Sequence, residues 1–245
     1  MSLFSKKSKV VSANYRFANI VQDIHSHVLP GLDDGSPDIE TSLELLKGLS
    51  GAGIRRLICT PHIIADIYRN TPATINAALD LLQKACLKEG LDTELSAAAE
   101  YMLDDHFMEL LRTKQPLLTL RRNYILTELS YATPPNNLEQ ISFEININNY
   151  QPLMAHPERY FYYHDNYDTY YRLKDLGFFL QVNLLSLTGH YGKTVMKAAH
   201  FLFKNNLVDF VGSDLHHAGH LGLLTNERNL DIIQKCLGER IYNQF

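Results

Sequence analysis

Seven short apolar runs alternate along the chain with longer segments that have the period of amphipathic helices. Most of the runs are nearly continuous in apolar residues, which suits strands covered on both faces in a parallel sheet. The runs span residues 20–24, 55–60, 92–99, 123–129, 152–155, 178–183 and 207–212. Strands that alternate with helices in this order predict an α/β fold, and seven repeats predict a TIM-like barrel one strand short of the (β/α)8 type.

Two of the helical segments have a clear start signal. Ser36-Pro37 predicts a helix over 37–50, with serine as the N-cap and proline at the first helical position. Thr71-Pro72 predicts a helix over 72–88 in the same way. Further helices are expected at about 104–112, 137–148, 166–176, 191–205 and 226–237.

No linker or low-complexity stretch divides the chain, so residues 20–245 are expected to form a single barrel domain. Residues 1–19 begin with the basic stretch MSLFSKKSKV, which lacks the apolar core of a signal peptide. We expect a mobile basic tail there, and contact with an anionic surface is the alternative.

The chain of 245 residues has 27 acidic and 23 basic side chains, a formal net charge of −4, which gives no electrostatic case for binding nucleic acid. Its three cysteines are far apart and lack a C-x-x-C pattern, so a reduced, cytoplasmic compartment is expected. No apolar run approaches the roughly 20 residues that cross a bilayer, so we expect no transmembrane segment.

Side chains that can bind metals follow six of the seven runs at the point where each run ends. They are His25, His27, His62, Glu100, Glu128, His156, Asp214 and His216. Each residue alone is more often a hydrogen-bonded structural residue than a ligand, but the C-terminal ends of barrel strands converge on one mouth. Carboxylates gathered there would repel one another, and divalent cations remove that repulsion. The set predicts two ions that share a carboxylate, or three, with Glu100 as the central candidate.

The stretch GLDDGSP follows the first run and adds two carboxylates, Asp33 and Asp34. It is read either as a turn that leads into the next helix or as a turn that also supplies a ligand, and the pattern does not decide between them. The ligand set contains no sulfur, since Cys59 lies inside a run. Imidazole and carboxylate ligands suit Mn²⁺, Fe²⁺ or Zn²⁺.

The segment 159–173, RYFYYHDNYDTYYRL, is rich in tyrosine. Tyr167, Tyr170 and Tyr171 have the i, i+3, i+4 spacing of residues that pack one face of a helix. The alternative is a docking surface for a peptide beside the mouth of the barrel, because aromatic residues are enriched at interfaces.

Taken in order, D-I-H-S-H, T-P-H, a lone Glu after the third run, E-L-S, A-H-P-E-R and S-D-L-H resemble the polymerase and histidinol phosphatase (PHP) family. H-x-E-R, and D-D-G soon after H-S-H, are typical of its CpsB-like branch, the bacterial protein-tyrosine phosphatases of capsule and exopolysaccharide loci. The resemblance spans roughly residues 22–217. It implies a distorted barrel of seven β/α units and a centre of three divalent ions, with Mn²⁺ favoured and Fe²⁺ or Zn²⁺ as alternatives.

The resemblance also implies roles for single residues. The first ion would be held by His25, His27, Glu100 and Asp214, the second by Glu100, Glu128 and His156, and the third by Asp34, His62 and His216. Arg159 would grip the phosphate. The branch usually has a second phosphate-binding arginine after the last motif, and here His217 and His220 stand in its place. Either of them could substitute in binding substrate, or both could be exposed loop residues, and His217 is in addition a candidate proton donor.

The function implied is a metal-dependent protein-tyrosine phosphatase that attacks phosphorus with a metal-activated hydroxide, with Glu100, Arg159 and His217 as catalytic residues. No cysteine has an arginine six positions later, so a thiol-dependent mechanism is not expected. The expected substrate is the tyrosine-rich tail of a polysaccharide co-polymerase kinase, and a homo-oligomer is compatible with the sequence. The alternatives are a phosphatase of histidinol phosphate or nucleotides, a catalytically silent metal-binding regulator, and an amidohydrolase. An amidohydrolase commonly uses a carbamylated lysine where this chain has Glu128.

Overall fold

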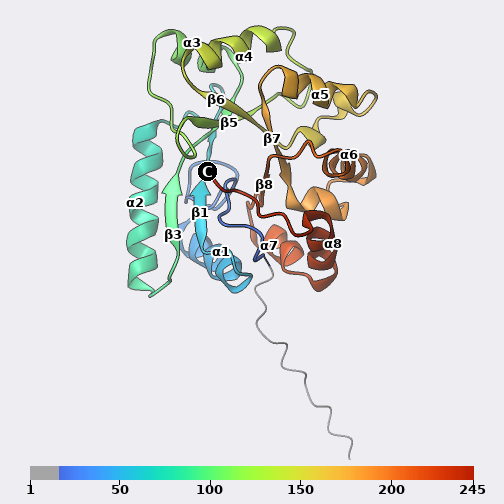
Figure 1. Cartoon of the computed structure of the whole chain (residues 1–245). Helices are drawn as coiled ribbons and strands as arrows, with labels where there is room; N and C mark the ends of the chain where they lie inside the picture. The colour runs from blue at the N-terminus through green and yellow to red at the C-terminus, as the bar shows by residue number, and fades with distance from the viewer. Residues whose placement is uncertain (1–16) are drawn as a thin grey trace, which may run out of the picture.

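The computed structural model describes residues 17–245 as strands and helices in the expected alternation (Figure 1). The strands are β1 (Arg56–Cys59), β2 (His62–Ile63), β3 (Glu94–Ala97), β4 (Glu100–Met102), β5 (Tyr124–Glu128), β6 (Gln151–Ala155), β7 (Phe179–Asn183) and β8 (Phe210–Gly212). The helices are α1 (Ile39–Gly51), α2 (Pro72–Lys88), α3 (Asp105–Arg112), α4 (Leu138–Ile147), α5 (Asp168–Asp175), α6 (Lys193–Lys204), α7 (Ala218–Leu224) and α8 (Glu227–Leu237). Three short 3₁₀ helices are η1 (Pro157–Arg159), η2 (Phe161–Tyr163) and η3 (Leu184–Thr188).

All pairings between the named strands are parallel, which confirms the predicted α/β class. Six strands follow the order β2-β4-β5-β6-β7-β8, and β1 pairs with β3 separately. The segment before α1 joins the two ends, since Asp23 bridges Leu57 of β1 and Ser26 bridges Leu215 after β8. The result is the distorted barrel of seven β/α units, with α2 beside β3 on one side and α6 and α8 on the other (Figure 1).

The first predicted strand is the main difference from the expected elements. Residues 20–24 form isolated bridges and no continuous strand. The carboxylate of Asp23 accepts hydrogen bonds from the backbone N–H of His25 and of Ser213, so a side chain takes over part of the pairing that a neighbouring strand would provide. The second run forms β1, and a separate short strand, β2, begins just after Pro61, which has no N–H to donate.

Two helices differ from the sequence-based expectation. Helix α1 begins at Ile39, because Asp38 and not Ser36 is its N-cap and accepts a hydrogen bond from the Thr41 N–H. Helix α7 was not expected, and its two glycines give it low helix propensity. Helix α2, by contrast, begins at Pro72 with Thr71 in a capping box, as predicted.

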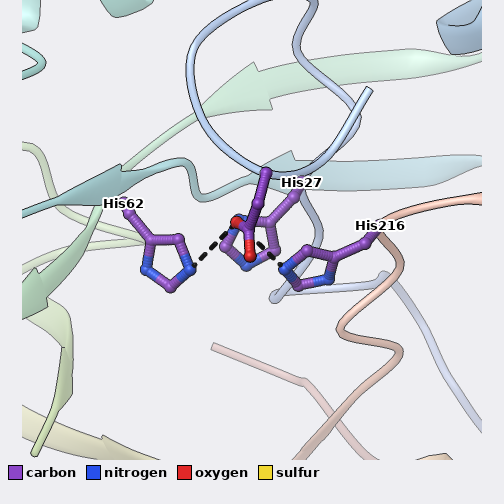
Figure 2. Close-up of side chains that lie close together, drawn as sticks. His27, His62 and His216 are labelled. Atoms are coloured by element: carbon purple, nitrogen blue, oxygen red, sulfur yellow. Dashed lines mark ion pairs between the residues drawn. The ribbon is translucent and has the colours of Figure 1, made fainter. Parts of the chain in front are cut away.

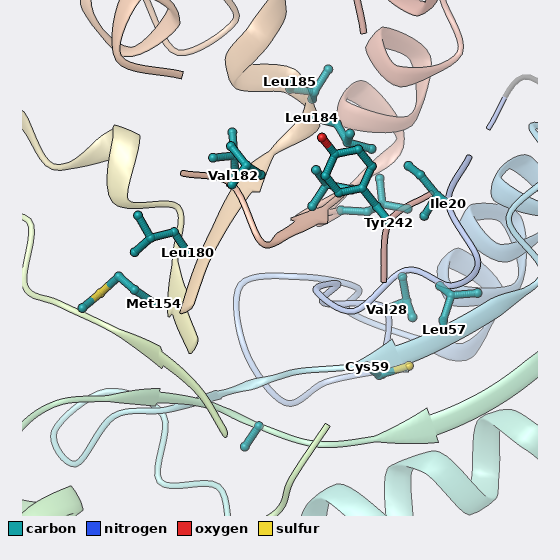
Figure 3. Packing of buried hydrophobic residues seen from close by; sticks show 14 of the residues in the cluster. Ile20, Val28, Leu57, Cys59, Met154, Leu180, Val182, Leu184, Leu185 and Tyr242 are labelled. Atoms are coloured by element: carbon teal, nitrogen blue, oxygen red, sulfur yellow. The ribbon is translucent and has the colours of Figure 1, made fainter. Parts of the chain in front are cut away.

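The core has two parts. The smaller cluster lies inside the barrel, because its strand residues share a face with Glu100 and Glu128 by the alternation of side chains along a strand. It contains Ile24, Ile58, Ala98, Leu120, Leu126, Leu153, Ala155 and Phe210. The larger cluster packs the helices against the outside of the strands, as Met154, Leu180 and Val182 show in Figure 3. A polar site can therefore form only above the smaller cluster, at the C-terminal ends of the strands.

Phe17 is buried in the larger cluster together with Ile20, so the packed part of the chain includes a residue that we assigned to the tail. Residues 1–16 of that predicted tail lie outside the described residues, and the division into tail and single domain stays a prediction. Within residues 17–245, no helix is both long and apolar enough to cross a membrane.

Candidate metal centre

The structure brings the predicted ligands together at one end of the barrel. Four overlapping groups of imidazole and carboxylate side chains each have ligand atoms within 4.8 Å of one another. Together the groups contain His25, His27, Asp34, His62, Glu100, Glu128, His156, Asp214 and His216. Parallel pairing explains the convergence, since His62 of β2 is directly beside Glu100 of β4.

His25 and His27 face the same two carboxylates. His25 Nε2 lies 3.2 Å from Glu100 Oε2 and 3.4 Å from Asp214 Oδ1. His27 Nε2 lies 3.4 Å from each of the same two oxygens. The two Nε2 atoms are 3.2 Å apart, and all four side chains are buried. One cation among these atoms would satisfy four ligands that otherwise face one another.

The two aspartates of the D-D-G turn have different positions. Asp34 Oδ1 lies 3.6 Å from Nε2 of both His62 and His216, which reach toward it from two sides (Figure 2). Asp33 points the other way and is a partner of His27, whose Nδ1 donates to Asp33 Oδ2 over 2.7 Å. The geometry therefore makes Asp34 the candidate ligand and Asp33 the residue that orients a ligand.

The remaining ligands surround Glu100. His156 Nε2 is 3.1 Å from Glu100 Oε1, and His62 Nδ1 is 2.8 Å from Glu128 Oε1 and 3.2 Å from Glu100 Oε2. Glu100 is thus in reach of four histidines, including His25 and His27, which suits a bridging carboxylate. The distances also group His62 with Glu128, whereas the resemblance assigns His156 to that ion.

The chemistry of the donor set fits divalent cations. Glu100 Oε1, Glu128 Oε1 and His62 Nδ1 are buried and lie close to imidazole or carboxylate atoms without forming a well-aligned hydrogen bond, so cations would satisfy these atoms better than their present contacts do. Cys59 is buried away from them in β1, and burial raises the pKa of its thiol to about 12. The ligands are therefore nitrogen and oxygen only.

The pKa values show how strongly these groups act on one another. Burial disfavours the charged imidazole of His25, but Glu100 and Asp214 outweigh it and raise its pKa to about 9. Burial similarly opposes ionisation of Glu100, yet His25 and His62 hold its pKa well below its ordinary value. At His156, burial and the charge of Arg159 together lower the pKa to about 4. Protons on some histidines thus balance the carboxylates, and cations that bind there would displace them.

Three residues around the ligands were not singled out from the sequence. Gln181 accepts from His25 Nδ1 over 2.7 Å, which leaves His25 Nε2 free to face the carboxylates. Gln181 in turn donates to Asn183, and Asn183 donates to Asp214 Oδ2 over 2.7 Å. Both amides come from β7, whose run ends without a histidine or an acid. The two amide side chains near the end of that run, FFLQVN, are the sequence feature that could have identified these residues. The third residue is Asp23, whose carboxylate accepts a hydrogen bond from the hydroxyl of Ser213, the neighbour of Asp214.

Two candidate ligands have a left-handed backbone conformation that is uncommon for residues other than glycine. His156 has φ of 34° and Asp214 has φ of 51°. Such conformations cost free energy and concentrate at functional sites, where the surrounding structure enforces them. Gly212, two residues before Asp214, is required for a steric reason, because a Cβ there would lie 2.6 Å from the Cβ of His25.

Arg159 stands at the edge of the cluster and lines a pocket of about 290 Å³. Its Nη1 donates to Asp214 Oδ2 over 2.7 Å. The neighbouring Glu158 is buried and anchors the same 3₁₀ turn, since its Oε1 accepts from the Asn183 N–H and the Ser186 hydroxyl. The pocket is lined by Asp34, His62, Glu128, Tyr131, His156, Arg159, Tyr191, Asp214, His216, His217 and His220. Candidate metal ligands and Arg159, the predicted phosphate-binding residue, therefore line the same pocket.

His217 and His220 also line this pocket, where the family pattern has its second arginine. His217 is exposed and caps α7, with its Nδ1 accepting from the His220 N–H. Burial and His217 lower the pKa of His220 to about 4, so His220 does not supply the permanent positive charge of the arginine that it replaces. The roles predicted for these two histidines stay predictions.

The tyrosine-rich segment is largely internal. Tyr160, Tyr163 and Tyr170 are buried, and the ring of Tyr167 packs on Phe201 of α6 with the ring centroids 4.6 Å apart. Tyr167 and Tyr170 therefore pack against α6 as the spacing predicts, whereas Tyr171 is 41% exposed. The three buried tyrosines are not available to a peptide.

Comparison with known proteins agrees with this site. Residues 21–244 match the family model described as "Capsular polysaccharide synthesis, CpsB/CapC". The tyrosine-protein phosphatase YwqE of Bacillus subtilis is 32% identical over 219 residues, which are 89% of this chain and 86% of that protein. The putative tyrosine-protein phosphatase CapC of Staphylococcus aureus is 28% identical over 85% of this chain and 83% of its own length.

Among solved structures, one match comes from work on YwqE from Bacillus subtilis and CpsB from Streptococcus pneumoniae, described as unique metal-dependent tyrosine phosphatases. It superposes with a TM-score of 0.75 at 30% identity and covers 92% of this chain and 96% of that one. The likeness extends over nearly the whole chain.

Proposed function

Because this chain belongs to the CpsB/CapC family of capsular polysaccharide synthesis, we propose that it is a metal-dependent protein-tyrosine phosphatase. The observation that carries the proposal is that Arg159 lines the same pocket as six of the candidate metal ligands. A planar guanidinium matches the oxygens of a phosphate, and a cluster of cations behind it suits a phosphomonoester dianion.

We propose three divalent ions, with Mn²⁺ favoured, and with the ligands divided as the family resemblance implies. The first set is His25, His27, Glu100 and Asp214, the second is Glu100, Glu128 and His156, and the third is Asp34, His62 and His216. The overlapping groups of ligand atoms support the first and third sets in outline, whereas for the second they bring His62 rather than His156 beside Glu100 and Glu128. When bound, such ions lower the pKa of water and offset negative charge on the phosphate.

The chain's own residues position the substrate and the proton. Arg159 uses one edge of its guanidinium on Asp214, and the remaining N–H groups are available to phosphate oxygens. The Nδ1 of His217 accepts a backbone hydrogen bond, so the neutral ring carries its proton on Nε2 and can donate it to a leaving oxygen. A tyrosinate leaving group needs little such help, because the pKa of a tyrosine hydroxyl in water is only about 10.

The proposed substrate is a phosphotyrosine protein, in particular the tyrosine-rich tail of a polysaccharide co-polymerase kinase. The names of the relatives support a phosphotyrosine substrate, and the choice of kinase follows from the family resemblance. We place the protein in the cytoplasm, where its three free cysteines would stay reduced.

The test begins with elemental analysis of protein purified without added metal, followed by assays on phosphotyrosine peptides, histidinol phosphate and nucleotides. We expect turnover of the peptides, its loss after chelation and its return with Mn²⁺, and no effect of thiol alkylation. Glu100→Gln should lose both bound metal and activity. Activity that survives thorough removal of metal contradicts the proposal, and faster turnover of a metabolite would favour the small-molecule phosphatase instead.

A further inference from the structure

Two tyrosine rings pack against Arg159, the residue proposed to bind the phosphate. The guanidinium carbon of Arg159 lies 4.4 Å from the centroid of the Tyr191 ring and 5.2 Å from that of Tyr131, and it lies over both rings. Both distances are within the range of cation–π attraction. With one edge on Asp214 and its face against aromatic rings, Arg159 is limited to in-plane hydrogen bonds toward the pocket.

The two tyrosines come from different parts of the barrel rim. Tyr131 follows β5 and lies before α4, whereas Tyr191 lies between η3 and α6. Tyr191 is flanked by Gly189 and Gly192, whose φ angles of 86° and 101° form a turn that most other residues would adopt only under strain. Both rings line the pocket, so they border the space that a group attached to the phosphate would occupy.

Tyr131 is further held by its neighbours. Its ring stacks on His156 with the centroids 5.9 Å apart, and it packs on buried Tyr160 at 5.4 Å. Its hydroxyl lies 3.4 Å from His156 Nδ1. Arg159 and His156 thus hold the ring, and the part of Tyr131 that stays exposed, 43% of the residue, borders the pocket.

We propose that Tyr131 and Tyr191 determine the preference of this pocket for aryl over saturated groups on the phosphate. A phosphate held by Arg159 places its substituent against these rings, and a flat aromatic substituent can stack on them or meet them edge to face. The inference rests on the proposed phosphatase function and adds the residues that select the leaving group. Aromatic pairs of this kind correspond to about a 2- to 12-fold gain in affinity for each ring.

The test uses two dianions that cannot be hydrolysed, phenylphosphonate and cyclohexylphosphonate, titrated calorimetrically into the metal-loaded full-length protein. The titrations are made at a pH above the second pKa of both acids, so that both ligands are dianions. Because the two anions still differ in basicity and ring size, the change in the ratio of their dissociation constants between the wild type and a variant is what reports the contact with each tyrosine. We expect the wild type to prefer phenylphosphonate by at least about 2-fold, and Tyr131→Leu and Tyr191→Leu each to reduce that preference. Tyr131→Phe and Tyr191→Phe keep the ring and should preserve it.

The matched control is Tyr171→Leu, which removes an exposed tyrosine of α5 that contacts Phe201 and does not line the pocket. Its ratio should equal that of the wild type. The inference is overturned if the wild type binds both phosphonates equally, or if the leucine variants keep the wild-type ratio while phosphotyrosine turnover persists. If the wild type binds neither phosphonate and hydrolyses no phosphomonoester, the proposed function itself fails.

Discussion

Replacing Asp33 by asparagine removes a charge that touches no proposed ion. Asp33 receives three hydrogen bonds, from His27 Nδ1 at 2.7 Å and the His62 N–H at 3.0 Å on Oδ2, and from the Gly35 N–H at 3.0 Å on Oδ1. Burial alone would raise the pKa of Asp33, but His27 lowers it to about 2, so the group is ionised at neutral pH. Asp33 therefore holds His27 in the orientation that directs Nε2 toward Glu100 and Asp214.

Asparagine has one acceptor oxygen where aspartate has two, and its amide is a donor. At least one of the three N–H groups then faces another donor, and the bond to His27 loses its charge. Hydrogen bonds to a charged group contribute about 1.5–3 kcal/mol, and loss of the partner that orients a metal-binding histidine typically lowers metal affinity about 10- to 100-fold. We expect Asp33→Asn to bind the same number of ions with affinity reduced by that factor.

The assay is a competitive titration of metal-free protein against a coloured chelator, with circular dichroism to confirm folding. Asp34→Asn is the matched control, since Asp34 is the neighbouring carboxylate that faces His62 and His216 directly. It should lose one ion from the stoichiometry, because it removes a ligand. If instead Asp33→Asn loses an ion and Asp34→Asn keeps all of them, the assignment of the two aspartates is the reverse of ours.

Three further predictions concern the anchor, the turn behind it and the barrel interior. Arg159→Lys keeps the charge but loses the planar fork, so kcat/KM for a phosphotyrosine peptide should fall about 10- to 100-fold, and an unchanged value would remove Arg159 from the phosphate site. Burial raises the pKa of Glu158 to about 7, above its unfolded value, so its contribution to stability is present below pH 4.5 and is lost as the pH rises toward 7. The unfolding free energy of Glu158→Gln should therefore rise relative to that of the wild type between about pH 4.5 and 7, by up to about 3 kcal/mol in denaturant unfolding, and parallel pH profiles would exclude this effect. Gly212→Ala places a Cβ 2.6 Å from His25 and should cost about 1–3 kcal/mol in denaturant unfolding together with bound metal, whereas Gly51→Ala, where a Cβ meets open space, should not reduce either.

Several elements were predictable because their signals are local. The buried strands β5, β6 and β7 appear as continuous apolar runs, and Thr71-Pro72 marks the start of α2. The first run failed as a strand because its backbone makes single bridges to two separate neighbours, Tyr242 and Leu57, and because the side chain of Asp23 accepts from the Ser213 N–H. Helix α7 was missed because it is short and contains two glycines, so its formation depends on packing rather than propensity.

The sequence by itself determined which side chains gather at the mouth of the barrel, because the C-terminal ends of parallel strands all lie at the same end of a barrel. The tertiary structure alone decided which of Asp33 and Asp34 faces the other ligands, that Gln181 orients His25 from 156 residues away, and that Tyr131 and Tyr191 close on Arg159. Contacts of this kind join side chains from separate loops, and the direction in which a loop side chain points is set by three-dimensional packing, which leaves no periodic trace in the sequence.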